Sequence, residues 1–412
     1  MTSASKQHDL TDIVIAGGGS AGLCAALALK RYAPDLSVEV IDARPPASGA
    51  GDQRASAIAA AARRMLDALG IWQEIEGEAQ PILSMDVTDS KLSDAVRPVF
   101  LTFGGSVSEG EPFAHMVPNG ALTGALTAAV EQAGVRLSAP QTVEGFTEAE
   151  ARMDLTLGSG ETRPCRLLIA ADGVRSRLRG LAGIRTNSWS YPQIAIVVNV
   201  SHERPHEGVA VEHFLPSGPF AILPLTGNRS SLVWTEKEAE ARALLESDDF
   251  VFQTELERRF GHRLGRIEVD GPRQGYPLGL VLARDFVRPR FALLGDAAHG
   301  IHPIAGQGLN LGFRDVAALS ETIVDAHRLG LDFGAVDILQ RYERWRRFDT
   351  WQMGVTTDLL NRLFSNDLAP VRTIRDIGLG LVDRMPGVKK MFIGEAAGLG
   401  SETPKLLAGE GL

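Results

Sequence analysis

Cysteine is nearly absent from this chain. Only Cys24 and Cys165 occur among its 412 residues, and they form no Cys-x-x-Cys pair. This argues against a dithiol redox centre and against a structural zinc site. Positive charge is also scarce, because 42 Lys and Arg against 51 Asp and Glu give a net charge of -9. Nucleic-acid binding needs clustered positive charge, so this composition argues against it.

Long apolar segments are missing as well. No apolar run reaches about 18 residues, so no membrane-spanning helix is expected. Residues 1–9 are polar and lack the apolar core of a signal peptide. These absences predict a cytoplasmic protein, and they leave open a peripheral contact with the inner face of the cytoplasmic membrane.

Short apolar strands alternate with helices in the first part of the chain, which predicts an α/β fold. Residues 12–16, 21–32 and 36–41 form a strand–helix–strand unit, and residues 54–69 are alanine-rich and expected to be helical. Four short strands separated by Pro and Gly turns within 193–234 predict an antiparallel sheet. We therefore expect a Rossmann-like domain (1–90, 117–185 and 275–335), interrupted by a β-rich substrate domain (91–116 and 186–274), and a helical C-terminal region (336–412).

A dinucleotide fingerprint follows the first strand. Gly17-Gly18-Gly19-Ser20-Ala21-Gly22 satisfies G-x-G-x-x-G between a strand and a helix. Gly17 permits the tight turn, Gly19 lets the backbone approach a pyrophosphate, and Gly22 allows close helix–strand packing. Asp42 ends the second strand, where it can accept hydrogen bonds from a ribose; it would repel a 2′-phosphate, so FAD or NAD is favoured over NADP. Arg54 either reaches the cofactor or is a solvated helix-end arginine.

Two further segments point to a flavin. Residues 166–179 form a strand that ends in Asp172-Gly173, with Ser176 and Arg179 following. This pattern resembles the Asp-Gly fingerprint of the aromatic-ring flavoprotein hydroxylases. The resemblance implies that Asp172 helps to place FAD and that Ser176 and Arg179 support the turn. It also implies that Gly295-Asp296 is the second FAD contact, with Asp296 accepting hydrogen bonds from the ribityl chain.

The run from His302 to Asp315 is similar to the signature of the ubiquinone-biosynthesis hydroxylases, the UbiH group of class A FAD-dependent aromatic monooxygenases, and the resemblance covers nearly the whole chain. It implies that FAD is the cofactor, that NAD(P)H is a transient co-substrate, and that one oxygen of O2 enters a polyprenylated phenol through a flavin C4a-hydroperoxide. The residues expected beside the ring are Pro303, Gly306, Gln307 and Gly308. The full set expected to bind the cofactor is Gly17, Gly19, Ser20, Ala21, Gly22, Asp42, Arg54, Asp172, Gly295, Asp296, Pro303, Gly306, Gly308, Leu309 and Asn310.

A helix that begins near Gly308 would direct its N-terminus at the anionic edge of a reduced flavin, which stabilises negative charge by about 0.3–2 kcal/mol. Asp296, His299 and His302 have the spacing of a metal site on a helix, but Pro303 and the glycines predict a loop. We therefore expect no metal, and we expect the histidines to be packed polar groups.

Other roles are less specified by the residues. No side chain stands out as a phenol-deprotonating base, and the aromatic and apolar residues of the predicted sheet could line the pocket or fill the sheet core: Phe214, Phe220, Leu223 and Trp234. The apolar and basic residues of 371–390 could rest on an anionic membrane or pack on the main body.

Three alternative functions remain compatible with the residues. They are a flavin hydroxylase of a small soluble phenol, a flavin-dependent prenyl reductase, and a non-catalytic subunit that assembles with other ubiquinone-biosynthesis proteins. A disulfide-type reductase is disfavoured, because the chain has no second G-x-G-x-x-G and no cysteine pair.

Overall fold

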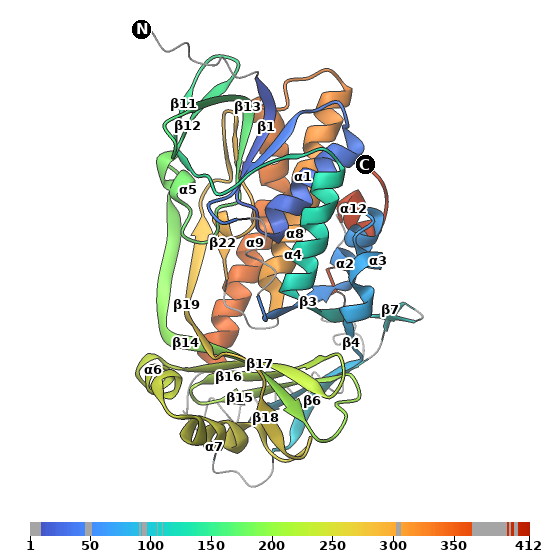
Figure 1. The fold of residues 1–412 in the computed structure, drawn as a ribbon, viewed down its shortest axis with the longest axis vertical. Helices are drawn as coiled ribbons and strands as arrows, with labels where there is room; N and C mark the ends of the chain where they lie inside the picture. Colours follow the sequence, from blue (N-terminus) through green and yellow to red (C-terminus); the bar gives the residue numbers. More distant parts are fainter. Residues whose placement is uncertain are drawn as a thin grey trace.

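The computed structural model describes residues 10–45, 52–89, 92, 97–104, 106–108, 110–301, 306–364, 394, 397–398 and 403–412. Its upper half in Figure 1 is built on a mainly parallel sheet in the order β10-β2-β1-β13, which continues through β12 and β11. The strands are β1 (Thr11–Ala16), β2 (Val38–Ile41), β10 (Arg136–Ser138), β11 (Val143–Glu148), β12 (Met153–Leu157) and β13 (Thr162–Ala170).

β13 connects two parts of this sheet. Its first residues pair antiparallel with β12, and its last residues pair parallel with β21 (Phe291–Leu293), which also pairs with β20 (Val287–Arg288). The neighbouring strand β1 pairs with β13 in parallel register, with Ala16 opposite Ala170. The carboxyl ends of β1, β13 and β21 therefore meet at one edge of the sheet, where α/β folds bind their ligands.

Helices cover this sheet and contribute to the main hydrophobic core. The helices are α1 (Ser20–Tyr32), α4 (Asn119–Gln132), α5 (Arg177–Leu181), α8 (Gln307–Arg328), α9 (Val336–Phe364) and α12 (Lys405–Ala408). α1, α8 and α9 pack side by side, and α8 is buried along most of its length. The helices confirm the expected α/β class.

A nine-stranded sheet forms the lower half, in the order β22-β19-β14-β17-β16-β15-β5-β6, with β18 paired to β14. The strands are β5 (Ser84–Asp89), β6 (Val99–Gly104), β14 (Thr186–His202), β15 (Val209–Leu215), β16 (Gly218–Leu225), β17 (Arg229–Lys237), β18 (Ile267–Val269), β19 (Gln274–Ala283) and β22 (His299–Gly300). The sheet is antiparallel as predicted, except that β5 pairs in parallel with β15. The predicted domain boundaries remain an inference, and this pairing favours ending the first segment before β5.

Two helices cover the far side of the nine-stranded sheet. They are α6 (Glu238–Glu246) and α7 (Asp249–Phe260), and both figures place them on the side away from the parallel sheet. The long strands β14 and β19 pair with each other over most of their length and connect the two halves.

One predicted helix is wrong in its first part. Residues 55–59 form β3 (Ala55–Ala59), and only then does α2 (Ala60–Ala68) begin. β3 pairs with β9 (Ala114–Pro118), which pairs with β4 (Gln80–Ile82). Alanine favours helix, but pairing with β9 overrides that weak preference. Nearby are α3 (Trp72–Ile75), η2 (Glu76–Glu78), β7 (Ser106–Ser108) and β8 (Glu111–Pro112).

Candidate functional site

The glycine-rich turn after β1 has little space for side chains. Gly17 has a φ of +125°, and a Cβ there would lie 2.2 Å from the Ala171 carbonyl oxygen. A Cβ on Gly22 would lie 2.0 Å from the carbonyl oxygen of Gly17. By contrast, a Cβ on Gly19 would meet nothing within 4 Å. Gly17 and Gly22 are therefore required for packing. Gly19 leaves open space at the start of α1, where a phosphate group can approach backbone N–H groups.

Asp42 lies beside this turn at the end of β2. Its Oδ2 accepts a hydrogen bond from the Gly18 N–H at 2.5 Å, and its Oδ1 accepts one from the Arg44 N–H at 2.7 Å. Asp42 also borders a small depression between β2, α1 and α4, whose walls are mainly apolar: Gly18, Leu23, Val40, Arg44, Pro45, Thr123, Thr127, Leu137 and Ala139. A depression with apolar walls and one carboxylate at its edge suits an adenosine.

The Asp-Gly and Gly-Asp segments lie next to each other because they follow neighbouring strands. Asp172 follows β13, is exposed, and accepts a hydrogen bond from the Leu178 N–H at 3.3 Å. Ser176 caps α5 by accepting from the Arg179 N–H at 3.0 Å. The Arg179 guanidinium then donates to the carbonyl of Ala297 at 2.7 Å, which ties the two segments together.

The Gly295 turn packs directly on the dinucleotide helix. Gly295 has a φ of +60°, and a Cβ there would lie 3.4 Å from the Ala21 methyl group and 3.8 Å from Gly312 of α8. Three small residues from distant parts of the sequence thus bring the starts of α1 and α8 to one place. Ala21 therefore contributes through packing.

Asp296, the next residue, is exposed. Surrounding protein raises its pKa through desolvation, and the nearby charge of Arg54 acts in the opposite direction. Arg54 itself is paired with Asp52 at 2.6 Å and lies over the Tyr276 ring. Arg54 precedes β3 instead of starting a helix. Its side chain lies close enough to Asp296 for their charges to interact, so Arg54 reaches the predicted cofactor site although it is far from Asp296 in the sequence.

The start of α8 forms another wall of the candidate cofactor site. Gly306 has a φ of +62°, and a Cβ there would lie 3.2 Å from the Ala57 methyl group of β3. A Cβ on Gly308 would meet nothing within 4 Å, and the first turn of α8 contains no acidic residue. The open space at Gly308 and the N-terminus of a helix fit the anionic edge of a flavin. Gln307 is buried at this start and Leu309 packs against the main core, while Pro303 and His302 lie outside the described residues.

Asn310 has its side chain committed to protein. Its Oδ1 accepts from the Ala59 N–H at 2.9 Å, and its Nδ2 donates to the Ala57 carbonyl at 2.8 Å. The Asn310 side chain therefore holds β3 against α8. Asn310 was expected to bind the cofactor, and any such contact would come from its backbone.

A buried ionic network lies beneath the Gly295 turn. Asp315 is fully buried and accepts hydrogen bonds from the Gly295 N–H at 3.1 Å, His299 Nε2 at 2.5 Å and Arg346 Nε at 2.8 Å. Burial alone would raise the pKa of Asp315, but His299 and Arg346 hold it below its usual value. This network joins the Gly295 turn, α8 and α9. No motif in the sequence marks Arg346 as part of it.

His299 is a packed residue, as expected, since it is fully buried and bonded to Asp315. In the part of the chain that the structure describes, no group of three or more His, Cys, Asp or Glu side chains could hold a metal ion. Within that same part, no helix is long and apolar enough to cross a bilayer.

The four residues considered as pocket lining lie on opposite faces of the nine-stranded sheet. Phe220 and Trp234 belong to the core between the sheet and the α6–α7 layer, so for these two residues the second alternative, filling the sheet core, is the one observed. Leu223 and Phe214 belong to clusters on the other face, with residues of β4, β5 and β9. Residues alternate between the faces of a strand, and the sequence does not say which face meets the cofactor.

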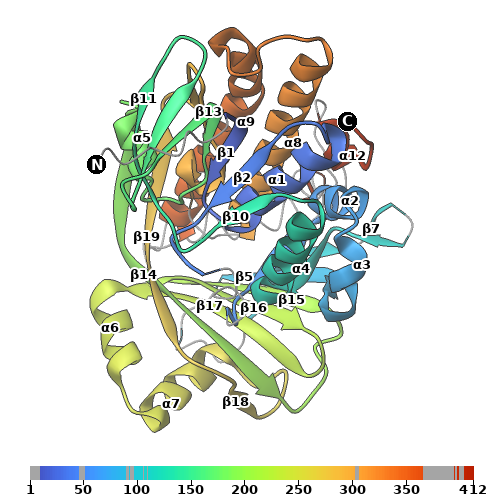
Figure 2. The same ribbon diagram turned by 45° about the horizontal axis from the view of Figure 1, so that its top comes forward.

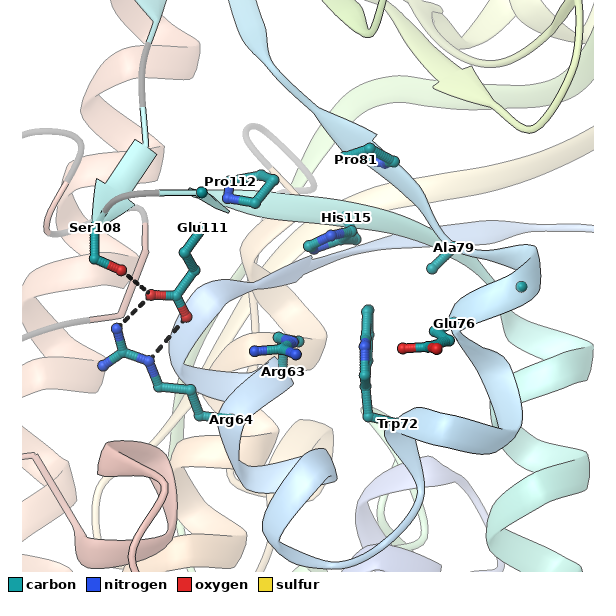
Figure 3. Close-up of a pocket in the computed structure, with 12 residues that line it drawn as sticks. Arg63, Arg64, Trp72, Glu76, Ala79, Pro81, Ser108, Glu111, Pro112 and His115 are labelled. Atoms are coloured by element: carbon teal, nitrogen blue, oxygen red, sulfur yellow. Dashed lines mark hydrogen bonds and ion pairs between the residues drawn. The ribbon is translucent and has the colours of Figure 1, made fainter.

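A larger depression lies on the outer side of the β3-β9-β4 sheet (Figure 3). Arg64 and Glu111 form an ion pair at 2.6 Å at one end, and the Arg63 guanidinium lies over the Trp72 ring near the centre. His115 shares this side of β9, whereas its neighbours Ala114 and Met116 face the cluster that contains Leu223. The sheet therefore separates this depression from the cofactor residues.

These features fit FAD: open backbone at the starts of α1 and α8, a small depression with mainly apolar walls beside Asp42, and a turn at Gly295 packed between the two helices. Most of the predicted residues lie on, or at the ends of, β1, α1, β2, β3, β13, η3 (Gly295–Ala297) and α8: Gly17, Gly19, Ser20, Gly22, Asp42, Arg54, Asp172, Gly295, Asp296, Gly306 and Gly308.

The comparisons with known proteins agree with this geometry. An FAD binding domain family matches residues 10–354. The chain is 47% identical to ubiquinone hydroxylase UbiL of Rhodospirillum rubrum, with 97% of this chain and 93% of the relative covered. It is 34% identical to 3-demethoxyubiquinol 3-hydroxylase of Escherichia coli, with 94% and 99% covered.

A solved structure shares the fold. p-Nitrophenol 4-monooxygenase PnpA of Pseudomonas putida superposes with a TM-score of 0.78 at 18% identity, covering 95% of this chain and 99% of that one. The chain belongs to the FAD-binding family of flavin monooxygenases that includes the ubiquinone-biosynthesis hydroxylases, and it is an FAD-dependent monooxygenase that uses NAD(P)H as electron donor.

Proposed function

We propose that this protein hydroxylates the aromatic ring of a polyprenylated phenol in ubiquinone biosynthesis, with O2 as oxygen source. The observation that carries the proposal is similarity over nearly the full length to two ubiquinone-pathway hydroxylases, combined with a cradle that fits FAD. FAD, when bound, takes a hydride from NAD(P)H and activates O2 for transfer to the ring.

The residues of the chain would bind and orient this chemistry. Gly19 and the start of α1 would hold the pyrophosphate, Asp42 the ribose, and Asp296 the ribityl chain. Asp172 would border the site from β13, and the start of α8 from Gly306 to Leu309 would face the flavin ring. The small residues Ala57 and Gly308 leave room there for a ring that a larger side chain would obstruct.

The apolar face of the nine-stranded sheet would exclude water from the reacting ring. Leu223 and Ala210 pack there with Met116 of β9 and Ala57 of β3. A dry wall opposite the start of α8 is what an oxygen-transferring flavoenzyme needs, because water would otherwise discharge the activated oxygen as peroxide.

We further propose that α9 rests on an anionic membrane surface that supplies the prenylated substrate. Four large apolar side chains are exposed at helical spacing along its second half: Phe348 (74%), Trp351 (36%), Val355 (50%) and Leu359 (62%). The exposed residues Arg344 and Arg347 precede them on the same side. Apolar and aromatic side chains next to cations are typical of helices that lie in a membrane interface. The predicted contact by residues 371–390 lies outside the described residues.

Mass spectrometry of a deletion strain tests the reaction. Loss of the gene should cause one prenylated quinone precursor to accumulate, and that precursor should lack a single ring hydroxyl. A precursor that instead differs in prenyl saturation would favour a prenyl reductase, and an unchanged quinone profile would contradict the proposal.

Flotation with vesicles tests the membrane contact. Holoenzyme should float with vesicles that contain phosphatidylglycerol, and the double variant Phe348→Ser/Leu359→Ser should not. Phe250→Ser is a matched control, because Phe250 is 81% exposed but lies on α7. Equal flotation of the double variant and the wild type would remove this role of α9.

A further inference from the structure

One acidic side chain on the nine-stranded sheet has no partner in the part of the chain that the structure describes. Glu212, in the middle of β15, is only 8% exposed. Among the described residues it makes no hydrogen bond and no ion pair. Buried carboxyl groups are rare unless they are paired, because desolvation of the charge is costly. An unpaired one therefore calls for a functional explanation.

The face on which Glu212 lies follows from its neighbours along the strand. Val211 and Leu215 pack in the core under α6 and α7. Ala210 and Phe214 pack in clusters on the opposite face. Because side chains alternate along a strand, Glu212 lies on the face that carries Ala210 and Phe214.

That face is directed toward the cofactor residues. Ala210 shares its cluster with Met116 of β9 and Ala57 of β3. Ala57 is the residue that a Cβ on Gly306, at the start of α8, would approach at 3.2 Å. On the same face of the sheet, the Asn199 amide reaches across to the Gln53 carbonyl at 2.9 Å. Glu212 thus lies on the sheet face that is directed toward the cofactor residues, between Ala210 and Phe214, and Phe214 packs with Leu363 near the end of α9.

The groups around Glu212 on this face are mostly apolar. Val87 of β5 and Ala221 of β16 lie directly opposite Glu212 on its two neighbouring strands. Asp89 is the acidic residue that β5 places on the same face, two positions further, and β16 contributes Leu223. Burial raises the pKa of Glu212 to about 8, with no charged neighbour among the causes. At neutral pH this carboxyl is therefore largely protonated and able both to donate and to accept a hydrogen bond.

We propose that Glu212 binds the ring hydroxyl of the aromatic substrate and orients the ring toward the start of α8. The phenol would thereby supply the partner that the described residues do not. Acceptance of the hydroxyl hydrogen by the Glu212 carboxyl would also increase the electron density of the ring, which favours attack on electrophilic oxygen. The proposal rests on the proposed function, and it adds the side chain that recognises a phenol. Nothing in the sequence pattern distinguished Glu212, because its face of the strand could not be assigned.

Binding of a matched pair of ligands to the holoenzyme tests this role. The probes are 2-geranylphenol and its methyl ether, 2-geranylanisole, with Kd taken from the flavin absorbance change. The wild type should bind the phenol at least about tenfold more tightly than the ether, the size expected for one lost hydrogen bond with a buried partner. Glu212→Leu should bind the two within about twofold, and Glu212→Gln should keep part of the preference.

The thermal stability of the ligand-free protein separates recognition from a structural role. Glu212→Leu removes an unpaired buried carboxyl, so its Tm should rise by a few degrees while phenol preference is lost. His213→Gln is the matched control, because His213 is the next residue and bonds to Thr88 on the other face. It should lose stability and keep the preference for the phenol.

Each outcome decides the proposal. A wild type without phenol preference, or a Glu212→Leu variant that retains it, would overturn the role of Glu212. If the wild type prefers the phenol but forms no hydroxylated product, the proposed reaction fails, whereas the binding comparison still decides the role of Glu212.

Discussion

The two faces of the nine-stranded sheet differ in the size of their side chains and in whether their polar groups are paired. The face under α6 and α7 is filled by large side chains, and its buried charges are paired: Glu236 accepts from Arg259 at 2.8 Å and from the Trp234 indole at 3.1 Å. The face toward the cofactor residues carries smaller side chains and polar groups that have no partner among the described residues: Asn199 Oδ1, Thr235 Oγ1 and the Glu212 carboxyl. One face stabilises the fold, and the other retains unmet hydrogen-bonding capacity for a ligand.

The largest expected effect comes from the helix-covered face. Trp234 is fully buried and packs against Phe220, Phe252 and the Arg259 guanidinium. Trp234→Ala should lower the free energy of unfolding by about 3–5 kcal/mol. Denaturant titration measures this loss, and the FAD Kd of the protein that remains folded should stay within about twofold. A large loss of FAD affinity with unchanged stability would contradict the assignment of this face to folding and of the other face to ligand binding.

Titration of Glu212, on the other face, should make the free energy of unfolding depend on pH. Its pKa is near 8 in the folded protein and near 4.5 when unfolded. The folded state therefore retains a proton that the unfolded chain has released, so this contribution to stability is complete below about pH 4.5 and is lost as pH rises through 8. The slope is at most about 1.4 kcal/mol per pH unit.

Glu212→Gln should flatten the fall in unfolding free energy between pH 5 and 8, measured by denaturant titration across that range. A variant with the same slope as the wild type would show that Glu212 titrates normally, and would place it in contact with water.

The network beneath the Gly295 turn should affect FAD more than folding. Asp315→Asn removes the charge that His299 and Arg346 face, and presents an amide N–H where three donors converge. The FAD Kd of the apoprotein should rise tenfold to hundredfold, about 1.4–2.7 kcal/mol. Asp325→Asn is the control on the same helix, because Asp325 bonds to Arg341 at a partly exposed site. Equal FAD affinity in both variants would contradict the role of Asp315.

The smallest expected effect concerns a single hydroxyl. Thr235 Oγ1 is buried without a partner in the described structure, so Thr235→Val should leave the free energy of unfolding unchanged or raise it by about 0.5–1 kcal/mol. Thr322→Val is the contrasting change, since Thr322 donates to the Ala318 carbonyl at 2.8 Å and should lose about 1 kcal/mol. Equal losses in chemical denaturation would indicate that Thr235 does have a partner.

The backbone motifs of the site could be predicted from sequence because their requirements are local. Gly17 and Gly22 must be glycine to close one turn, and Asp42 ends the strand that follows the first helix. The resemblance also related Gly295 and Asp172 to one cofactor, and the parallel pairing of β13 with β21 brings these segments together.

The remaining features depend on distant contacts. Residues 55–59 are alanine-rich, and only pairing with β9 and the Asn310 side chain make them a strand. Phe220 and Phe214 cannot be assigned to core or pocket until the face of each strand is known. Arg346 joins the Asp315 network from a helix 31 residues away, and no local pattern marks it.

Oxygen-isotope labelling tests the central claim most directly. Purified holoenzyme would be supplied with NADH, a prenylated phenol and 18O2 in unlabelled water, and the product would be analysed by mass spectrometry. A monooxygenase should place one 18O atom in the new ring hydroxyl. A product without label, formed while NADH is consumed, would contradict a monooxygenase and favour reduction of the substrate.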